Sequence, residues 1–379
     1  MPKTVVCVVG TRPEAVKMAP VIRALHDSPD FICKVVLTAQ HREMLDQVMR
    51  QFELKGDADL DIMSPRQTLL QITTRALEGL DIVYAELKPD IVLAQGDTTT
   101  VFAAALTAFY AHIPFAHVEA GLRTFNKYSP FPEEMNRRLA GVLTDIHFAP
   151  TPESAANLVR EGYKDNIYIT GNTVTDALIW AAERGKLPED LKWIDTITGP
   201  LILVTAHRRE NWGEPLRQSC LGMLDLIEKV PNAHLIYAVH KNPVVQEIAK
   251  EILGNHPRVK LIDPPDYFDF IQIMKRARLI LTDSGGIQEE APSLGVPVLV
   301  LRDTTERPEA IVAGVAKLIG PIREKIVEEG LPLLIDNAAH AKMARAANPY
   351  GDGKACARIV GILKYFFEMS KEIPENFKV

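Results

Sequence analysis

Small and charged residues follow several apolar runs of this sequence, and their types are those that bind anions and transfer protons. The most specific of these segments is residues 283–290 (DSGGIQEE), which directly follows an apolar run. Gly285 and Gly286 allow a diphosphate to approach backbone amides closely at the start of a helix. Glu290 can then accept hydrogen bonds from ribose hydroxyls. The segment predicts a diphosphate site, and the alternative is a plain glycine turn beside an exposed acid.

Residues 205–211 (TAHRREN) place an imidazole directly before two guanidinium groups. A histidine that follows a strand is often structural, but the two arginines favour an anionic-ligand site in which His207 donates or transfers a proton. The polar segment 302–309 follows the next apolar run. In it, Arg307 is a second candidate for binding phosphate.

Residues 10–17 (GTRPEAVK) combine a glycine turn with an arginine and a lysine at the mouth of a helix. Such a site attracts phosphate. The alternative is a helix start in which Pro13 occupies the first turn and Arg12 is merely solvated. Both interpretations stay open from these residues alone.

Three acids follow apolar runs in the first half of the chain: Asp97 in residues 96–100 (GDTTT), Glu119 in residues 117–123 (HVEAGLR) and Glu133 in residues 129–138. A carboxylate at the end of a buried strand is costly unless it is paired or used, so Glu119 is a candidate for chemistry. Asp97 has the alternative role of a helix cap, and Glu133 that of an acid favoured by a helix dipole.

Some common cofactor motifs are missing from the sequence. No Gly-x-Gly-x-x-Gly follows a predicted strand, and no Gly-x-x-x-x-Gly-Lys-Ser/Thr occurs, which disfavours NAD and the usual nucleotide-triphosphate loop. The four cysteines are scattered and no paired Cys or His spacing is present, so we expect no structural zinc and no other metal. The sequence predicts a protein without cofactors.

Composition limits the partners and the compartment. The net charge of −6 gives the 379-residue chain no overall bias toward nucleic acid. We expect no export signal at the N-terminus, and the long apolar stretch 101–118 is interrupted by polar residues and a proline, so no membrane span is expected. Unpaired cysteines fit a reducing compartment, and we expect a cytoplasmic location.

The elements that must position these residues alternate regularly. Short apolar runs predict strands at residues 4–9, 33–38, 91–95, 115–119 and 146–149, and then at 201–205, 234–238, 259–262, 279–282 and 298–301. Amphipathic segments predict helices at 14–26, 42–52, 67–87, 99–112 and 133–144, and then at 215–230, 243–253, 268–276 and 286–294. Alternation of this kind predicts doubly wound parallel sheets.

The alternation restarts after a charged helical connector at residues 177–191, which predicts two domains. We expect a Rossmann-like domain over residues 1–172, a second over 173–354, and a C-terminal helix within 355–379 that packs back on the first. The fold class is α/β, with two Rossmann-like domains facing a central cleft. Ligands bind at the carboxyl ends of the strands in such sheets.

Several of these segments occur together in one known family. Residues 10–14 (GTRPE), 96–99 (GDTT), 117–123 (HVEAGLR), 283–290 (DSGGIQEE), 305–308 (TERP) and 348–353 (NPYGDG) resemble the bacterial non-hydrolysing UDP-N-acetylglucosamine 2-epimerases. The likeness runs in order from residue 4 to residue 353. It implies the GT-B type fold, which many nucleotide-sugar glycosyltransferases share, and a homodimer.

The resemblance also implies roles for individual residues. Those that would hold UDP are Arg12, His207, Ser284, Gly285, Gly286, Glu290 and Arg307, with Phe270 near the uracil. Those that would surround the sugar are Lys17, Asp97, Glu119, Glu133 and His207. One departure is the second proline of Pro264-Pro265, which puts a uracil contact in question and leaves the reaction untouched.

The reaction implied by the resemblance is the reversible conversion of UDP-N-acetylglucosamine to UDP-N-acetylmannosamine. No carbonyl adjoins C2 to acidify its proton, so the expected route is anti elimination of UDP to a 2-acetamidoglucal, followed by syn re-addition. Asp97, Glu119, Glu133 and His207 supply enough titratable groups for acid and base, and the sequence leaves open which one takes the C2 proton.

Many bacterial members bind a second UDP-N-acetylglucosamine as an activator. The matching positions are Gln40, His41, Arg66, Gln67, Arg209 and His240, whereas Glu43 replaces a glutamine of some regulated members. Whether the second site operates here stays open at this point.

Three other functions remain as alternatives. A hydrolysing 2-epimerase would release free N-acetylmannosamine, and a glycosyltransferase of the same fold would need a separate acceptor. A nucleotide-sugar-binding regulator would make no use of Asp97, Glu119 and Glu133 as acids or bases. Fold similarity alone does not choose among these, so the residues of the site must.

Overall fold

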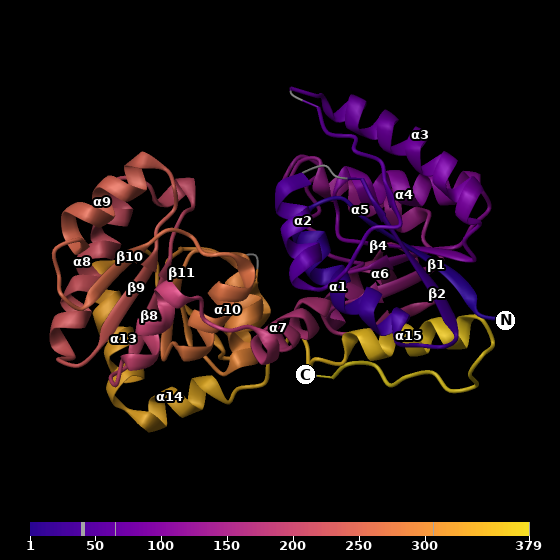
Figure 1. Cartoon of the computed structure of the whole chain (residues 1–379). Coiled ribbons are helices and arrows are strands. Elements are labelled where there is room, and N and C mark those ends of the chain that lie inside the picture. The colour runs from indigo at the N-terminus through magenta and orange to yellow at the C-terminus, as the bar shows by residue number, and fades with distance from the viewer. Residues whose placement is uncertain (39–41, 65, 306, 379) are drawn as a thin grey trace. The chain divides into compact units, whose positions relative to one another are not determined.

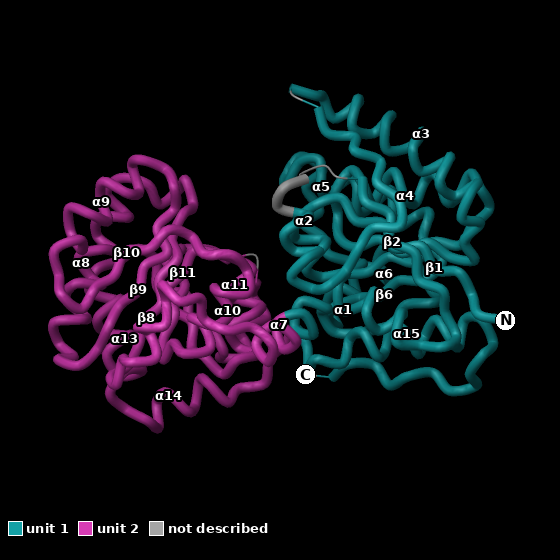
Figure 2. Tube along the Cα trace, in the orientation of Figure 1, with its two compact units in different colours: residues 1–177, 350–378 teal, residues 178–349, 379 magenta. Residues whose placement is uncertain are grey.

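The computed structural model of the chain describes residues 1–38, 42–64, 66–305 and 307–378 (Figure 1). The chain forms two compact units: residues 1–177 with 350–378, and residues 178–349 (Figure 2). The expected domain limits at 172 and 354 stay a prediction.

Unit 1 is built on a seven-stranded parallel sheet in the described part of the chain, with strand order β3-β2-β1-β4-β5-β6-β7. Its strands are β1 (Lys3–Val9), β2 (Phe31–Leu37), β3 (Ala58–Asp59), β4 (Ile91–Gln95), β5 (Phe115–Val118), β6 (Ile146–Ala149) and β7 (Ile167–Ile169). Its helices are α1 (Arg12–His26), α2 (Arg42–Gln51), α3 (Leu69–Leu87), α4 (Thr99–Tyr110), α5 (Glu133–Val142), α6 (Pro152–Arg160) and α15 (Ala355–Phe366), and α7 (Thr173–Arg184) continues into unit 2.

Unit 2 has a six-stranded parallel sheet over its described residues, with strand order β10-β9-β8-β11-β12-β13. Its strands are β8 (Leu201–Thr205), β9 (His234–Ala238), β10 (Val259–Ile262), β11 (Leu279–Thr282), β12 (Val298–Val300) and β13 (Ala316–Leu318). Its α-helices are α8 (Glu214–Lys229), α9 (Pro243–Leu253), α10 (Tyr267–Arg276), α11 (Gly285–Glu290), α12 (Pro308–Val312), α13 (Arg323–Ile335) and α14 (Asn337–Ala344). Short 3-10 helices cover Glu189–Thr196, Arg209–Asn211 and Ala291–Leu294.

Both sheets reverse their strand order at one point, between β1 and β4 in unit 1 and between β8 and β11 in unit 2. The loops that follow these two adjacent strands diverge to opposite faces of the sheet, and the crevice between them is where ligands bind in open α/β sheets. Residues 10–17, 96–100, 205–211 and 283–290 of the sequence analysis are the loops and helix starts at these two points. The predicted fold class, α/β with two Rossmann-like domains, is confirmed.

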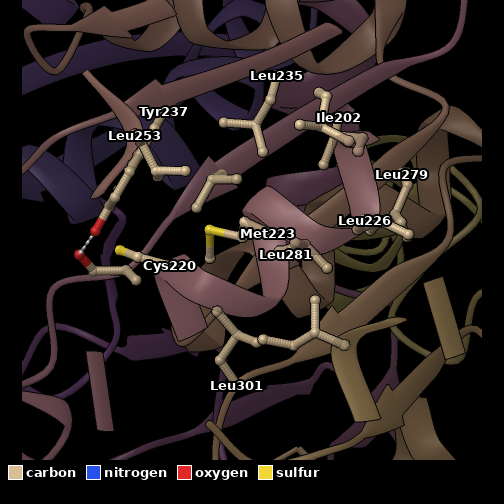
Figure 3. Packing of buried hydrophobic residues seen from close by; sticks show 14 of the residues in the cluster. Ile202, Cys220, Met223, Leu226, Leu235, Tyr237, Leu253, Leu279, Leu281 and Leu301 are labelled. Atoms are coloured by element: carbon tan, nitrogen blue, oxygen red, sulfur yellow. Dashed lines mark hydrogen bonds between the residues drawn. The ribbon is translucent and has the colours of Figure 1, made fainter. Parts of the chain in front are cut away.

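The core of unit 2 explains why its strands read as continuous apolar runs. Helix α8 packs against α9 and α13, and side chains of α8 such as Met223 and Leu226 lie fully buried beside Leu281 of β11 (Figure 3). Tyr237 is also buried, and its hydroxyl donates to the carbonyl oxygen of Ala206 at 3.1 Å. A sheet covered on both faces needs no polar alternation, which is why these strands lack it.

All ten strands predicted from the sequence form, most of them within two residues of the predicted bounds. Strands β3, β7 and β13 were not predicted, because they contain only two or three residues, of which only Ala316 is buried. The expected helix 286–294 divides into α11 and a 3-10 segment, with Pro292 in the first turn of the latter. Helix α15 packs against α1 within unit 1. None of the described helices is both long and apolar enough to cross a membrane.

Candidate active site

The two loops at the reversal point of unit 1 are joined by Glu14, a buried residue in the first turn of α1. Its carboxylate accepts the backbone N–H groups of Gly10 (2.6 Å) and Thr11 (3.1 Å) and the hydroxyl of Thr98 (2.5 Å). Burial raises the pKa of Glu14 from 4.5 to about 7, although the three donors oppose this rise. Glu14 therefore fixes the loop after β1 to the loop after β4.

The sequence analysis did not single out Glu14. The signal was present, because Thr11 followed by Glu14 is the capping-box spacing at a helix start. The neighbouring Gly10 is required by packing: a β-carbon at this position would overlap the hydroxyls of Thr38 and Thr100, which lie 3.0 Å from each other. The carboxyl ends of β1, β2 and β4 are thus held in close contact.

Glu119 is the most constrained acid of unit 1. It follows β5 with φ at +65°, and only 8% of its surface is exposed. Its carboxylate accepts hydrogen bonds from Lys17 (2.5 Å), from the amide of Gln95 and from the amide of Asn172 (3.0 Å). A left-handed backbone conformation at a non-glycine residue costs free energy and tends to occur at functional sites. A carboxylate at the end of a buried strand was expected to be paired or used, and Glu119 is paired with Lys17.

Asp97 is paired with an arginine of helix α5. Arg137 of α5 donates to one carboxylate oxygen of Asp97 through Nε (2.9 Å) and Nη2 (2.6 Å). The alternative role of Asp97 as a helix cap is wrong, because Thr98 is the residue that precedes α4. Arg137 also donates to the buried Glu134 (3.3 Å), which accepts two backbone N–H groups of the loop before α5. Sequence reasoning missed Arg137, since nothing local marks it as the partner of Asp97.

His117 holds the turn that carries Asp97. Burial lowers the pKa of His117 to about 4, so its ring is neutral at pH 7. In the neutral form Nε2 donates to the carbonyl oxygen of Gly96 at 2.7 Å. His117 is therefore a structural support of the site.

Two predicted ligand-binding residues of unit 1 differ from the others in the contacts of their charged groups. The guanidinium of Arg12 and the carboxylate of Glu133 are both partly buried, and neither makes a hydrogen bond or ion pair with any residue that the structure describes. By contrast, Lys17, Asp97 and Glu119 all have partners of opposite charge. Arg12 and Glu133 are thus available for a ligand without breaking a contact.

The loops at the reversal point of unit 2 are joined by Asp283, which is fully buried and directly follows β11. Its carboxylate accepts the backbone N–H groups of His207 (2.9 and 3.0 Å) and Arg208 (2.8 Å) and the side-chain amide of Asn211 (3.2 Å). The sequence analysis quoted Asp283 within a motif but gave it no role.

The imidazole of His207 lies between two other groups. Its Nδ1 is 3.6 Å from a carboxylate oxygen of Asp283, and its ring stacks on that of His240 with centroids 5.9 Å apart. Burial lowers the pKa of His207; Asp283 opposes this shift, while His240 and Arg208 add to it. The ring is therefore mainly neutral at pH 7, a form that both accepts and donates a proton.

The glycine turn after Asp283 leaves space that no described side chain fills. A β-carbon built on Gly285 meets no atom within 4 Å, and one on Gly286 meets only the hydroxyl of Ser284 at 3.9 Å. Neither glycine has a positive φ. Since the fold itself does not require glycine at these positions, the open space fits a ligand that approaches the backbone.

The other predicted ligand residues of unit 2 are Arg307 on the loop after β12, Glu290 at the end of α11 and Phe270 on α10. Arg307 is ion-paired with Glu289, and the Thr305 hydroxyl donates to Gln288 (2.7 Å), whose amide donates to the carbonyl oxygen of Ser284 (3.2 Å). Glu290 is buried and Phe270 of α10 is partly buried. The loop after β12 is thereby connected to the glycine turn.

The residues proposed for a second ligand are only partly placed. Gln40, His41 and the side chain of Glu43 lie outside the described residues. Arg66 and Gln67 belong to a turn of unit 1, where Gln67 accepts the N–H of Ser64 (3.1 Å). In unit 2, Arg209 lies over the ring of Trp212 and His240 stacks on His207. His240 therefore contacts a predicted catalytic residue.

Metal ligands are not gathered in the part of the chain that the structure describes: no group of three or more His, Cys, Asp or Glu side chains there has the geometry to hold an ion. Unit 1 instead provides paired carboxylates, and unit 2 provides a neutral imidazole and an open glycine turn. These groups suit proton transfer on a ligand that carries a phosphate.

Known proteins resemble this chain over most of its length. A family model described as UDP-N-acetylglucosamine 2-epimerase matches residues 23–364. The UDP-N-acetylglucosamine 2-epimerase of Escherichia coli K12 is 53% identical over 369 residues, covering 95% of this chain and 98% of the relative. A crystal structure of a UDP-N-acetylglucosamine 2-epimerase has a TM-score of 0.93 at 47% identity, covering 100% of this chain and 99% of the other. The Neisseria meningitidis enzyme, solved bound to UDP-N-acetylglucosamine, has a TM-score of 0.82 at 49% identity, covering 96% and 100%.

Replacing Glu14 by glutamine tests the buried carboxylate. Because the pKa of Glu14 is about 7 in the folded protein and near 4.5 when unfolded, the folded state binds more protons between these values. The unfolding free energy then falls as the pH rises from 4.5 to 7, by about 3 kcal/mol for 2.5 pH units. We expect Glu14→Gln to flatten the pH dependence of the melting temperature in this window.

The matched control is Glu251→Gln, which removes an exposed carboxylate whose pKa Arg217 lowers, so that it titrates below the window. Melting curves from pH 4.5 to 7.5 make the comparison. If Glu14→Gln and the wild type lose stability in parallel over this range, the carboxylate does not titrate as described.

Proposed function

The chain belongs to the UDP-N-acetylglucosamine 2-epimerase family, and we propose that it converts UDP-N-acetylglucosamine reversibly to UDP-N-acetylmannosamine without releasing free sugar. The observation that carries the proposal is the set of acids at the carboxyl ends of β4 and β5. There, Glu119 is buried in a left-handed conformation and paired with Lys17, while Asp97 is paired with Arg137. A protein that only binds a nucleotide sugar has no use for such an arrangement.

The proposed route is elimination and re-addition. A base removes the C2 proton while the bond between C1 and the diphosphate oxygen breaks, which yields UDP and 2-acetamidoglucal. An acid then protonates C2 on the opposite face as UDP adds back to C1. No electron acceptor is needed, and the same UDP leaves and returns.

UDP is assigned to the loops of unit 2 and to Arg12. Gly285 and Gly286 offer backbone N–H groups beside open space, Ser284 offers its hydroxyl, and Arg307 adds a cation once it exchanges Glu289 for a phosphate oxygen. Glu290 is proposed to hold the ribose, and Phe270 to lie near the uracil. Donors fixed on the leaving diphosphate stabilise the charge that develops when the C1–O bond breaks.

Acid and base are drawn from Asp97, Glu119, Glu133 and His207. The four differ in their surroundings: Asp97 and Glu119 each have a cationic partner, Glu133 has no partner among the described residues, and His207 is mainly neutral. Groups whose environments differ this much are suited to opposite roles in proton transfer.

Proton NMR of the purified protein with UDP-N-acetylglucosamine in heavy water tests the reaction. Without acceptor or added cofactor, we expect UDP-N-acetylmannosamine to appear with deuterium at C2, because the C2 proton exchanges with solvent through the base. Free N-acetylmannosamine with UDP would identify a hydrolysing enzyme, and an unchanged spectrum would contradict the proposal.

In the same assay, a sigmoidal dependence of the rate on substrate concentration is expected if a second UDP-N-acetylglucosamine activates the enzyme. A hyperbolic dependence would contradict that second site.

Gly286→Ala separates ligand binding from folding. The added methyl group meets no protein atom closer than 3.9 Å, so the melting temperature should stay within about 2 °C of the wild type. The same methyl occupies the space proposed for the diphosphate, and we expect UDP affinity, measured by calorimetry, to fall at least tenfold, about 1.4 kcal/mol. Unchanged UDP affinity in a folded variant would place the diphosphate elsewhere.

We also propose a homodimer that associates in the cytoplasm through unit 1. Helices α3, α4 and α5 pack side by side, and their exposed apolar side chains include Leu70, Ile82, Phe109, Tyr110, Leu139 and Val142. Apolar side chains gathered on neighbouring helices favour association. Light scattering of the purified chain should give about twice 42.1 kDa, and a mass of 42.1 kDa at micromolar concentration would contradict the dimer.

A further inference from the structure

The buried carboxylate of Asp283 contacts both the backbone N–H and the imidazole of His207. We propose that Asp283 is the positioning residue of His207: its buried carboxylate fixes the backbone of the loop and holds the imidazole proton on Nδ1, which leaves Nε2 to exchange a proton with the substrate. This inference rests on the proposed function, in which His207 transfers a proton. The tautomer and the pKa of the His207 imidazole can be measured even if the protein shows no turnover.

The first support is the backbone. Asp283 is fully buried, and an isolated carboxylate in such a place is strongly unfavourable unless donors surround it. Two consecutive N–H groups, those of His207 and Arg208, and the amide of Asn211 provide these donors at 2.8 to 3.2 Å. The Asn211 amide also donates to the carbonyl oxygen of Leu301 (3.0 Å), which ties the loop to the end of β12. His207 therefore sits on a backbone with little freedom.

The second support is the ring. Nδ1 of His207 is the atom that lies 3.6 Å from Asp283, so Nε2 lies on the opposite edge of the imidazole. A carboxylate facing one ring nitrogen favours the tautomer with its proton on that nitrogen, and this pairing orients bases in many enzymes. The carbonyl oxygen of His207 is held too, since Nε1 of Trp212 donates to it at 3.2 Å.

The charges around His207 come from three elements. Asp283 follows β11, His240 follows β9, and Arg208 is next in the chain. Nδ1 of His240 accepts the N–H of Asn242 at 3.1 Å, so the proton of neutral His240 is on its Nε2. Of the three groups, Asp283 alone raises the pKa of His207, against the lowering by burial, His240 and Arg208. Removing its charge should therefore lower the pKa of His207 further.

The third support is the place of Asp283 in the chain. It directly precedes Ser284, Gly285 and Gly286, the turn to which the diphosphate is assigned. One carboxylate thus joins the proton-transfer loop to the phosphate turn, so that a ligand held by the turn meets His207 in a fixed position.

The experiment is an NMR titration of the full-length protein labelled with 15N at histidine, with His207→Gln used to assign the His207 signals. We expect neutral His207 to carry its proton on Nδ1 in the wild type. In Asp283→Asn we expect its pKa to fall by about 1 unit, because the opposite charge is lost. The control Asp225→Asn removes a carboxylate that pairs with Arg323 elsewhere in unit 2 and should leave the His207 titration unchanged.

Kinetics in the epimerase assay complete the test. Asp283→Asn should lower kcat by about 100-fold with a smaller change in KM, since general acid–base catalysis contributes about 100-fold or more. In the His207→Gln background the same change should cost less than about threefold, because the two residues act as one unit. Additive losses would overturn the proposal.

Two outcomes remain informative if Asp283→Asn does not fold or the protein shows no turnover. The tautomer is measured in the wild type alone, and a proton on Nε2 of neutral His207 would overturn the proposal. Absence of turnover with the proton on Nδ1 would contradict the epimerase function and support the structural pairing, so the two failures are distinct.

Discussion

A buried carboxylate that must be surrounded by donors is the constraint on which both halves of this protein depend. In each unit the strand order reverses once, and at that point one acid joins two loops: Glu14 accepts hydrogen bonds from the loops after β1 and β4, and Asp283, which follows β11, accepts them from the loop after β8. Neither carboxylate is stable in its position unless both loops are in place. The interaction that stabilises each loop pair therefore also fixes the groups that a ligand would meet.

The remaining site residues are arranged around these anchors in the same manner. Glu119 accepts hydrogen bonds from Lys17, Gln95 and Asn172, and Asp97 forms an ion pair with Arg137. Most of these charges are therefore paired within the protein. A few groups are left for the ligand: Arg12, Glu133 and the open space beside Gly285 and Gly286. Donors and acceptors fixed in advance need little rearrangement during reaction, which is the main way that an enzyme lowers a barrier electrostatically.

The sequence predicted the architecture well because the parallel strands are continuous apolar runs separated by amphipathic helices. It missed β3, β7 and β13, which have two or three residues each and are too short to leave such a signal. It also named Asp97, Glu119 and His207 from residue type and position. Their partners, Arg137, Asn172 and Asp283, were missed as partners because they are 40, 53 and 76 residues away in the chain, and only the fold brings them together. The family resemblance is confirmed, whereas the roles of individual residues are proposals that rest on this geometry.

The most direct test of the account is a crystal structure of the full chain with UDP-N-acetylglucosamine bound. We expect diphosphate oxygens on the backbone N–H groups of Gly285 and Gly286, with Nε2 of His207 and at least one of Asp97, Glu119 and Glu133 within hydrogen-bonding reach of the sugar. A diphosphate bound away from Gly285 and Gly286, or a sugar that meets none of the three carboxylates, would contradict it.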